Sequence, residues 1–218
     1  PGYSYRWIGG NSQFVVIPHE VMECDCLLHY DHDTYFYGSL AEPVSCIVGG
    51  YHCNYHATPG VYVHNMGIVE GGNTILMAAA GPMGLEAIDY AIHCDRKPGL
   101  LVVTDIDSVR LKRAASIHTV EEAEKNGVKL VYVNTNDVEN AHDYLMELTG
   151  GKGYDDAFVY APVKPVVELA DSVLGKDGCL NFFAGPTDKQ FSAKMNFYDV
   201  HYNSTHVMGT TGGNTADM

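Results

Sequence analysis

Basic residues are scarce in this sequence, which has 13 Lys and Arg against 27 Asp and Glu and a formal net charge of −14. No basic run or stripe offsets the acidic charge, whereas nucleic acids and anionic membrane surfaces attract proteins through clustered positive charge. Long apolar runs are also absent: stretches such as 74–80 and 100–103 are far too short to span a bilayer, and no signal peptide is visible. We therefore expect no nucleic-acid partner and no membrane partner.

The six cysteines lack the spacing of a metal or disulfide framework, because no two of them form a CxxC pair. Reduced thiols in a cytoplasmic protein are the better interpretation. Internal repeats and low-complexity segments are absent as well. What remains is an ordinary globular composition, with 46% hydrophobic and 18% charged residues over 218 positions, enough to bury the core of one or two domains.

From residue 73 onwards, short apolar segments alternate with segments of helical periodicity. The segments predicted as strands are 73–80, 100–104, 128–133, 154–160, 179–183 and 206–209. Those predicted as helices are 85–93, 108–116, 138–148 and 165–174. Strands that alternate with helices indicate an α/β fold with a Rossmann-type doubly wound parallel sheet.

The residues before this alternation have a different pattern. A helix is expected over 41–56, where apolar residues recur at helical spacing, with Pro43 at its start and 58–60 at its end. The remaining expectations are a strand over 12–18, irregular chain or a second strand over 20–28, and a loop over 31–33.

A glycine-rich turn follows the first strand of the alternating region. Ala79-Ala80-Gly81-Pro82-Met83-Gly84 is the GxGxxG fingerprint with Ala in its first position, and Asp105 ends the next predicted strand 21 residues after Gly84. Without a Cβ, Gly81 lets a pyrophosphate approach the backbone, and Gly84 lets the helix pack closely on the sheet. The helix N-terminus attracts the phosphates, and Asp105 accepts hydrogen bonds from the ribose hydroxyls. The spacing predicts a dinucleotide site, with a phosphate-free glycine turn as the alternative.

Further cofactor-binding residues are expected around this turn. Pro82 and Met83 lie within it, and the loops that contain Ala161 and Gly185 follow two later strands. Ligands of open parallel sheets bind beyond the carboxyl ends of the strands, so these loops should lie on the same edge as the turn. Arg110 either stacks near the adenine or meets a 2′-phosphate, or it is a solvated helix residue, and both interpretations stay open.

The acidic residue after the fingerprint also bears on cofactor choice. The carboxylate of Asp105 would repel a 2′-phosphate and hydrogen-bond a free 2′-hydroxyl, which favours NAD over NADP. Arg110 and Lys112 would weaken this preference, because their charges attract a phosphate.

Several groups of residues, taken in chain order, carry a family resemblance. They are Gly9-Gly10 with 14–18, Glu42-Pro43-Val44-Ser45 at the start of a helix that carries His52, the turn 81–84, and Thr104-Asp105-Ile106-Asp107. These motifs resemble the zinc-dependent medium-chain dehydrogenase/reductase family over essentially the whole chain, and its sorbitol-dehydrogenase-like members share the Glu-Pro helix opening. A closer similarity, to sugar-phosphate reductases of this family, is carried by 41–46, 54–56, 59–64 and 181–187.

The resemblance implies an oxidoreductase that transfers a hydride between NAD or NADP and a sugar alcohol, a ketose or a phosphate of either. It assigns residues 1–60 to the C-terminal part of a β-rich, GroES-like catalytic domain with its connecting helix, and residues 61–218 to a dinucleotide-binding Rossmann domain. Since the chain begins at Pro1 and ends at Met218, inside these domains, we expect a fragment that lacks both ends. Family members also form homo-oligomers through sheet edges.

In this family a catalytic zinc is bound by a Cys, by an adjacent His-Glu pair and, in some members, by a carboxylate of the Glu-Pro helix. The Cys and the pair lie before the region that matches Pro1, which leaves Glu42 as the expected metal-site residue, with a helix-capping role as the alternative. We interpret His19-Glu20 as a chance surface pair. The resemblance therefore implies Zn²⁺ in the intact protein and leaves the catalytic residues of this chain unknown.

Other polar motifs give weaker signals. His52 and His56 have i, i+4 spacing, but no Glu lies between them, so contact histidines are favoured over metal ligands. Cys24 and Cys26 alternate as in a strand, which would point them to opposite faces. Because the zinc ligands are not in the sequence, the alternative to an enzyme is a non-catalytic dinucleotide-binding module.

Overall fold

The computed structural model describes residues 12–210, 212–213 and 216–217. Gly9 and Gly10, which contribute to the family resemblance, lie outside the described residues, as do Pro1 and Met218. The chain divides into two compact units, residues 1–41 and 42–218. The assignment of residues 1–60 to a catalytic domain stays a prediction.

The first unit contains two short helices, α1 (His19–Glu23) and α2 (Tyr35–Gly38). The strand expected over 12–18 is wrong: this segment has no regular secondary structure before α1, and Phe14 is 92% exposed. A strand is stable only when its backbone pairs with another strand, and the described residues of this unit include none. The loop expected over 31–33 is confirmed.

The alternation expected for Cys24 and Cys26 is also wrong. The chain turns at this point, because the backbone N–H of Cys26 donates to the carbonyl of Val21 at 2.9 Å. The Cys26 thiol in turn donates to the Cys24 carbonyl at 3.4 Å. These local hydrogen bonds replace the cross-strand bonds that an extended segment would need.

The second unit is built on a six-stranded sheet in which every pair of neighbouring strands is parallel. The strands are β3 (Asn73–Met77), β4 (Leu100–Asp105), β5 (Lys129–Asn134), β6 (Tyr154–Val159), β7 (Leu174–Asn181) and β8 (His206–Met208). Their order across the sheet is β5-β4-β3-β6-β7-β8, so the chain winds outwards in both directions from β3. This order confirms the Rossmann-type doubly wound fold.

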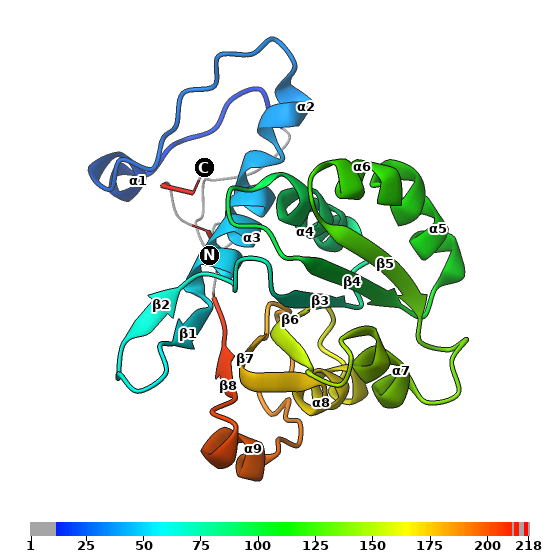
Figure 1. Ribbon diagram of the computed structural model, residues 1–218. Helices are drawn as coiled ribbons and strands as arrows, with labels where there is room; N and C mark the ends of the chain where they lie inside the picture. Colours follow the sequence, from blue (N-terminus) through cyan, green and yellow to red (C-terminus); the bar gives the residue numbers. More distant parts are fainter. Residues whose placement is uncertain (1–11, 211, 214–215, 218) are drawn as a thin grey trace. The chain divides into compact units, whose positions relative to one another are not determined.

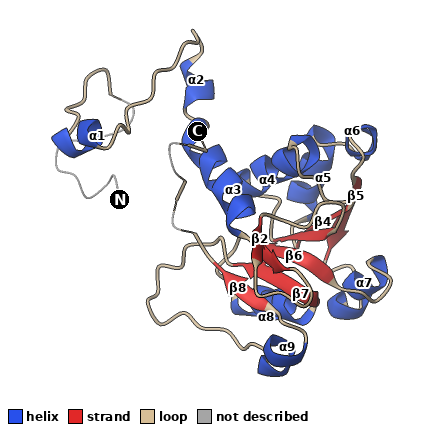
Figure 2. Cartoon of the chain, turned by 60° about the vertical axis from the view of Figure 1, so that its left-hand side comes forward, coloured by secondary structure: helices blue, strands red, loops and turns tan. Residues whose placement is uncertain are grey.

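Helices cover both faces of this sheet (Figure 1). One face carries α3 (Ala41–Cys53), α4 (Pro82–His93), α5 (Ser108–Ile117) and α6 (Val120–Lys125), and the other carries α7 (Ala141–Leu148) and α8 (Lys164–Ser172). Side chains of a strand point alternately to the two faces, so Leu76 packs with Ile88 of α4, whereas its neighbour Ile75 packs in the cluster of Leu145 of α7. A last short helix, α9 (Phe197–Tyr202), precedes β8 (Figure 2).

α3 ends before the predicted boundary at residue 56. The chain instead continues into an antiparallel hairpin of β1 (Tyr55–Ala57) and β2 (His64–Met66). The buried side chain of Asn54 donates a hydrogen bond to Asp156 of β6 at 2.6 Å, which draws the backbone out of the helix. No helix among the described residues has the length and hydropathy needed to span a membrane.

Candidate functional site

The carboxyl ends of the parallel strands border a cleft of about 440 Å³. Gly81 follows β3, Asp105 ends β4 and Ala161 follows β6, and all three line the cleft. The predicted residues Pro82, Met83, Gly84 and Arg110 line it as well. The eighth residue expected to bind the cofactor, Gly185, is exposed and follows β7 on the same edge, outside the described wall of the cleft.

The glycine-rich turn has the shape that its sequence predicts. The chain leaves β3 at Ala78, which has φ +55 in the left-handed region. A Cβ on Gly81 would have no neighbour within 4 Å among the described residues, so the backbone is open to an approaching group. A Cβ on Gly84 would collide with the Ala79 carbonyl. The two glycines therefore have different roles. Gly81 leaves the backbone accessible to a ligand, and Gly84 allows the helix to pack closely against the end of the strand.

The N-terminus of α4 points its free donors into this cleft. Gly81 is the N-cap residue, Pro82 occupies the first turn, and no side chain in the described part of the chain caps the helix. The N–H groups of the first turn have no partner within the helix, and the helix dipole places partial positive charge there. Met83 and Gly84 of this turn line the cleft, so an anionic group would meet them there.

Asp105 fixes the turn as well as facing the cleft. It is 8% exposed, and one carboxylate oxygen, Oδ1, accepts hydrogen bonds from the backbone N–H groups of Ile106 at 2.8 Å and Asp107 at 3.0 Å. The other oxygen, Oδ2, accepts from the backbone N–H of Ala80 at 3.1 Å. A carboxylate oxygen can accept two hydrogen bonds, so Oδ2 retains one acceptor position for a ligand hydroxyl. The sequence predicts the acidic residue but not its bond to the glycine turn.

Arg110 lies on the wall of the cleft and its side chain is 64% exposed. Its Nε is 3.6 Å from the carboxylate of Asp107, the residue that caps α5. The backbone N–H groups of Arg110 and Val109 donate to that carboxylate and hold the pKa of Asp107 below its usual value. Both interpretations of Arg110 stay open, because it is a solvated helix residue and also borders the cleft.

The sequence does not predict two unpartnered polar groups, one in Tyr160 on the wall of the cleft and one in Glu86 of α4. Tyr160 follows β6 and lines the cleft, with its ring centre 5.0 Å from that of Phe183. Its hydroxyl and the Oε2 atom of Glu86, in α4, are buried without a hydrogen-bond partner among the described residues. Burial raises the pKa of the Glu86 carboxyl, and the charge of Glu42 raises it further. The sequence feature that could have predicted one of these groups is Glu86 itself, a carboxylate among the apolar residues that follow the turn.

The described residues do not by themselves form a zinc site. Glu42 lies exposed in the first turn of α3, where its Oε1 accepts a hydrogen bond from the Cys46 thiol at 3.4 Å. No group of three or more His, Cys, Asp or Glu side chains in the described part of the chain is placed to hold a metal ion. A catalytic zinc needs about three protein ligands, so a metal role for Glu42 stays a prediction.

The histidines whose neighbours or spacing could suggest metal ligands contact other residues instead. His19 lies 3.0 Å from Glu23 on the surface of α1. His52 lies on α3, whereas His56 lies on β1 with its Nε2 3.1 Å from Oδ1 of Asp156. Because α3 ends before His56, the i, i+4 pair does not form, and the contact interpretation is confirmed.

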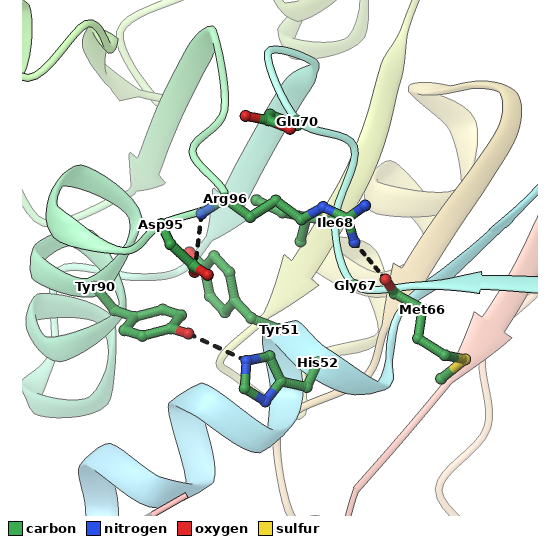
Figure 3. A pocket seen from close by; sticks show the side chains of 9 residues that line it. All are labelled: Tyr51, His52, Met66, Gly67, Ile68, Glu70, Tyr90, Asp95 and Arg96. Atoms are coloured by element: carbon green, nitrogen blue, oxygen red, sulfur yellow. Dashed lines mark hydrogen bonds between the residues drawn. The ribbon is translucent and has the colours of Figure 1, made fainter.

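A second cavity, of about 390 Å³, is bordered by α3, the end of α4 and the segment that leads into β3 (Figure 3). The Arg96 guanidinium donates to the carbonyl of Met66, and its backbone N–H donates to Asp95 at 3.0 Å. The Tyr90 hydroxyl lies 3.4 Å from Nε2 of His52. These polar groups contact one another, unlike the unpartnered atoms of Glu86 and Tyr160.

Comparison with known proteins places this geometry in a family. The sequence profile of the zinc-binding dehydrogenases matches residues 82–218. Mannitol-1-phosphate 5-dehydrogenase of Aliivibrio fischeri is 54% identical over 217 residues, which cover 100% of this chain and 51% of that protein. L-sorbose 1-phosphate reductase of Klebsiella pneumoniae is 52% identical over 218 residues, which cover 100% of this chain and 52% of that protein. The chain therefore spans about half the length of these relatives.

Solved structures show the same fold. The chain superposes on 2R,3R-butanediol dehydrogenase from Bacillus subtilis with a TM-score of 0.62 and 18% identity, covering 88% of this chain and 48% of that one. At this identity the likeness shows the fold alone. The expected similarity to sugar-phosphate reductases, and to L-sorbose 1-phosphate reductase among them, is confirmed by the sequence comparison.

Proposed function

The chain belongs to the zinc-binding dehydrogenase family, and we propose that the protein transfers a hydride between a nicotinamide dinucleotide and the carbinol carbon of a sugar alcohol or its phosphate. The cleft at the carboxyl ends of the strands is the observation that supports this most directly. An open approach at Gly81, an uncapped helix N-terminus and the oriented carboxylate of Asp105 meet there. Phosphates and ribose hydroxyls are the groups that such features bind.

The proposed reaction interconverts L-sorbose 1-phosphate and D-glucitol 6-phosphate. Both relatives carry a sugar or polyol phosphate in their names, L-sorbose 1-phosphate in one and mannitol 1-phosphate in the other. The proposed cofactor is NAD in preference to NADP, because the carboxylate of Asp105 is held at the cleft by three backbone N–H groups and would repel a 2′-phosphate. We also propose a homo-oligomer that joins through sheet edges, which are β5 and β8.

In this reaction the described residues bind and orient the dinucleotide. The first turn of α4 would hold the pyrophosphate, and Asp105 would accept a hydrogen bond from the adenosine ribose through Oδ2. Apolar walls that include Met83 and Val163 would keep water from the nicotinamide. Zinc in this family supplies Lewis-acid polarisation of the substrate oxygen, but no step is assigned to Glu42, because the described residues do not complete a metal site.

A non-catalytic dinucleotide-binding module is the second candidate. One observation favours it: the described residues contain no group of three or more metal ligands. Such a module would share the cleft and its dinucleotide but would not turn over a polyol.

Two measurements test these candidates. Fluorescence titration of the 218-residue chain with NADH and NADPH should show binding, tighter for NADH, and absence of binding would contradict the proposal. A metal assay and a polyol-phosphate oxidation assay on the same chain should show no stoichiometric zinc and no turnover, because loss of Lewis-acid polarisation lowers the rate by on the order of 10³-fold or more. Robust turnover with stoichiometric zinc would instead show that the metal ligands have been misplaced.

A further inference from the structure

The β1–β2 hairpin lies beside β7 and β8 and joins α3 to β3 (Figure 1). Its two strands have three residues each, and so short a hairpin is marginally stable on its own. The position of the hairpin therefore depends on its contacts with the sheet. Two of these contacts are made by histidine rings, one from His56 of β1 and one from His206 of β8, and both cross the junction between hairpin and sheet.

Both ring nitrogens of His56 face hydrogen-bond acceptors. Nδ1 lies 3.0 Å from the backbone carbonyl oxygen of Asp177, and Nε2 lies 3.1 Å from Oδ1 of Asp156. The Asp156 carboxylate is completely buried and already accepts hydrogen bonds from Asn54 and Val69. A neutral imidazole carries one N–H group, whereas the imidazolium carries two. Only the protonated ring of His56 can donate to both acceptors at once.

His206 is placed in the same way from the opposite side of the junction. Its Nδ1 lies 3.0 Å from the carbonyl oxygen of Ser204, and its Nε2 lies 2.7 Å from the carbonyl oxygen of Tyr55 in β1. A carbonyl oxygen only accepts, so these two contacts also require two N–H groups on one ring. The His206 ring in addition stacks on the Tyr55 ring, with the ring centres 4.1 Å apart.

The charges around the two rings favour a proton on them. Burial lowers the pKa of His56, but the Asp156 hydrogen bond and charge, together with Asp177, outweigh burial and leave the pKa above its usual value. The two rings lie 6.1 Å apart, so each opposes the charge of the other. The titratable groups around them are Asp155 and Asp156 of β6, Asp177 and Cys179 of β7, Tyr55 of β1 and His64 of β2.

His64 shows what stacking without these hydrogen bonds looks like. Its ring covers Tyr55 as well, with the ring centres 4.1 Å apart and the planes inclined by 27°. Its side chain is exposed, and its nitrogens have no hydrogen-bond partner among the described residues. A change in the protonation of His64 therefore breaks no hydrogen bond between the hairpin and the sheet.

We propose that His56 and His206 form a proton-dependent latch, which holds the β1–β2 hairpin against β6, β7 and β8 and weakens as the pH rises. Loss of a proton leaves each ring with one N–H group for two acceptors, so one hydrogen bond is lost at each ring. The hairpin then opens locally, whereas the pairing of β3 with β4 and β6 involves neither ring and persists. The latch is independent of dinucleotide binding.

Amide hydrogen exchange of the unaltered chain at pH 6 and pH 8 tests the latch, with each rate divided by the intrinsic rate at that pH. Protection of residues 55–57 and 64–66 should fall by roughly 2- to 10-fold for each ring that loses a hydrogen bond. Protection of β3 and β4 should stay constant. Equal protection of the hairpin at the two pH values would overturn the proposal.

Three variants assign the effect to the rings. His56→Gln and His206→Gln replace a titrating ring by an amide that cannot become charged. Each should lower hairpin protection at pH 6 and reduce its dependence on pH, and the double variant should abolish that dependence. His64→Gln is the matched control and should keep the full dependence. If His64→Gln abolishes it as well, stacking on Tyr55 and not the hydrogen bonds holds the hairpin, and the proposal is wrong.

Nitrogen NMR of the histidine rings tests the same proposal without any substitution, so it stands even if a variant does not fold. At pH 6 both nitrogens of His56 and of His206 should carry protons, and titration to pH 8 should remove one proton from each ring in step with the loss of hairpin protection. A neutral His206 ring at pH 6, with the hairpin closed, would contradict the latch.

Discussion

Within β6, the completely buried carboxylate of Asp156 accepts hydrogen bonds from Asn54 at 2.6 Å, from His56 at 3.1 Å and from the backbone N–H of Val69 at 2.9 Å. At the end of β4, the carboxylate of Asp105 also accepts three hydrogen bonds and is 8% exposed. The two residues differ in access, because only the second lines a cleft. Burial and hydrogen-bond number therefore do not distinguish the candidate site residue from the interior one, whereas position at the carboxyl edge does.

The two tyrosines of the same strand region repeat this contrast. Tyr154 begins β6 and its hydroxyl is bonded to a backbone carbonyl, whereas Tyr160 follows β6 and its hydroxyl is unpartnered in the described part of the chain. In this region the interior hydroxyl thus holds the fold together, whereas the hydroxyl that follows the strand takes no part in a hydrogen bond with the described residues. Substitutions on each side should separate stability from binding.

Replacement of Asp156 should have the largest effect on stability. Asp156→Ala leaves Asn54, His56 and the Val69 N–H without their acceptor, and breaking a buried charged pair costs about 3–5 kcal/mol. Urea denaturation would measure this loss. The matched control is Glu139→Ala on the exposed surface, expected within about 0.5 kcal/mol of the unaltered chain. A loss below about 1 kcal/mol at Asp156 would show that the interior network does not hold the fold.

The two glycines of the turn should respond differently to the same methyl group. Gly84→Ala forces its Cβ against the Ala79 carbonyl and should destabilise the chain by about 1–3 kcal/mol. Gly81→Ala meets open space, so the free energy of unfolding should hardly change. Its methyl group would, however, obstruct the pyrophosphate and weaken NADH binding about tenfold or more. Equal stability losses in the two variants would contradict the separate roles given to them.

Asp105→Ser should shift cofactor preference. Removing the carboxylate removes repulsion of a 2′-phosphate and an acceptor for the 2′-hydroxyl, so the ratio of NADH to NADPH affinity should fall by about tenfold. Titration with both cofactors measures this ratio. Arg110→Ala is the comparison for a cation on the wall of the cleft and should move the ratio the opposite way. An unchanged ratio in Asp105→Ser would refute ribose recognition by this residue.

The smallest expected effect is a pH dependence at His56. Burial lowers the pKa of this imidazole, but Asp156 together with Asp177 outweighs burial, so the pKa lies above 6.5. Its protonated form is therefore favoured in the fold. The stability that it contributes is complete below pH 6.5 and is lost as pH rises through the raised pKa. The titratable ring of His206 lies 6.1 Å away, and the charge of His56 also acts on the carboxyl of Asp155.

Comparison of the unaltered chain with His56→Gln isolates the contribution of His56 to the free energy of unfolding. The difference in the free energy of unfolding should shrink between pH 6 and pH 8.5. A difference that grows with pH would reverse the sign assigned to the His56–Asp156 pair.

Local chemistry explains which features can be predicted from the sequence. The turn 81–84 and Asp105 are recognisable because each acts through its own backbone freedom or charge within one βαβ unit. The end of α3 is not, because the contact between Asn54 and Asp156 joins residues 102 positions apart. The strand expected over 12–18 fails for the same reason, since pairing requires a distant segment.

The unpartnered atoms of Tyr160 and Glu86 are unpredictable for a related reason. A tyrosine after a strand and a glutamate in a helix are individually unremarkable in a sequence. Their unpartnered state depends on how the fold buries the two atoms without supplying acceptors or donors among the described residues. Only the assembled fold reveals it.

Under the proposed function, the hydrogen bond from the Ala80 N–H to Asp105 would constrain how this lineage can exchange one cofactor for another. A single substitution at Asp105 would change ribose recognition and would at the same time release the backbone that shapes the glycine turn. The first mutant on that route would therefore bind either cofactor poorly. Substitutions that stiffen residues 78–81 would have to arise earlier, so the order of mutations, and not only their identity, decides whether a NADP-preferring descendant is accessible.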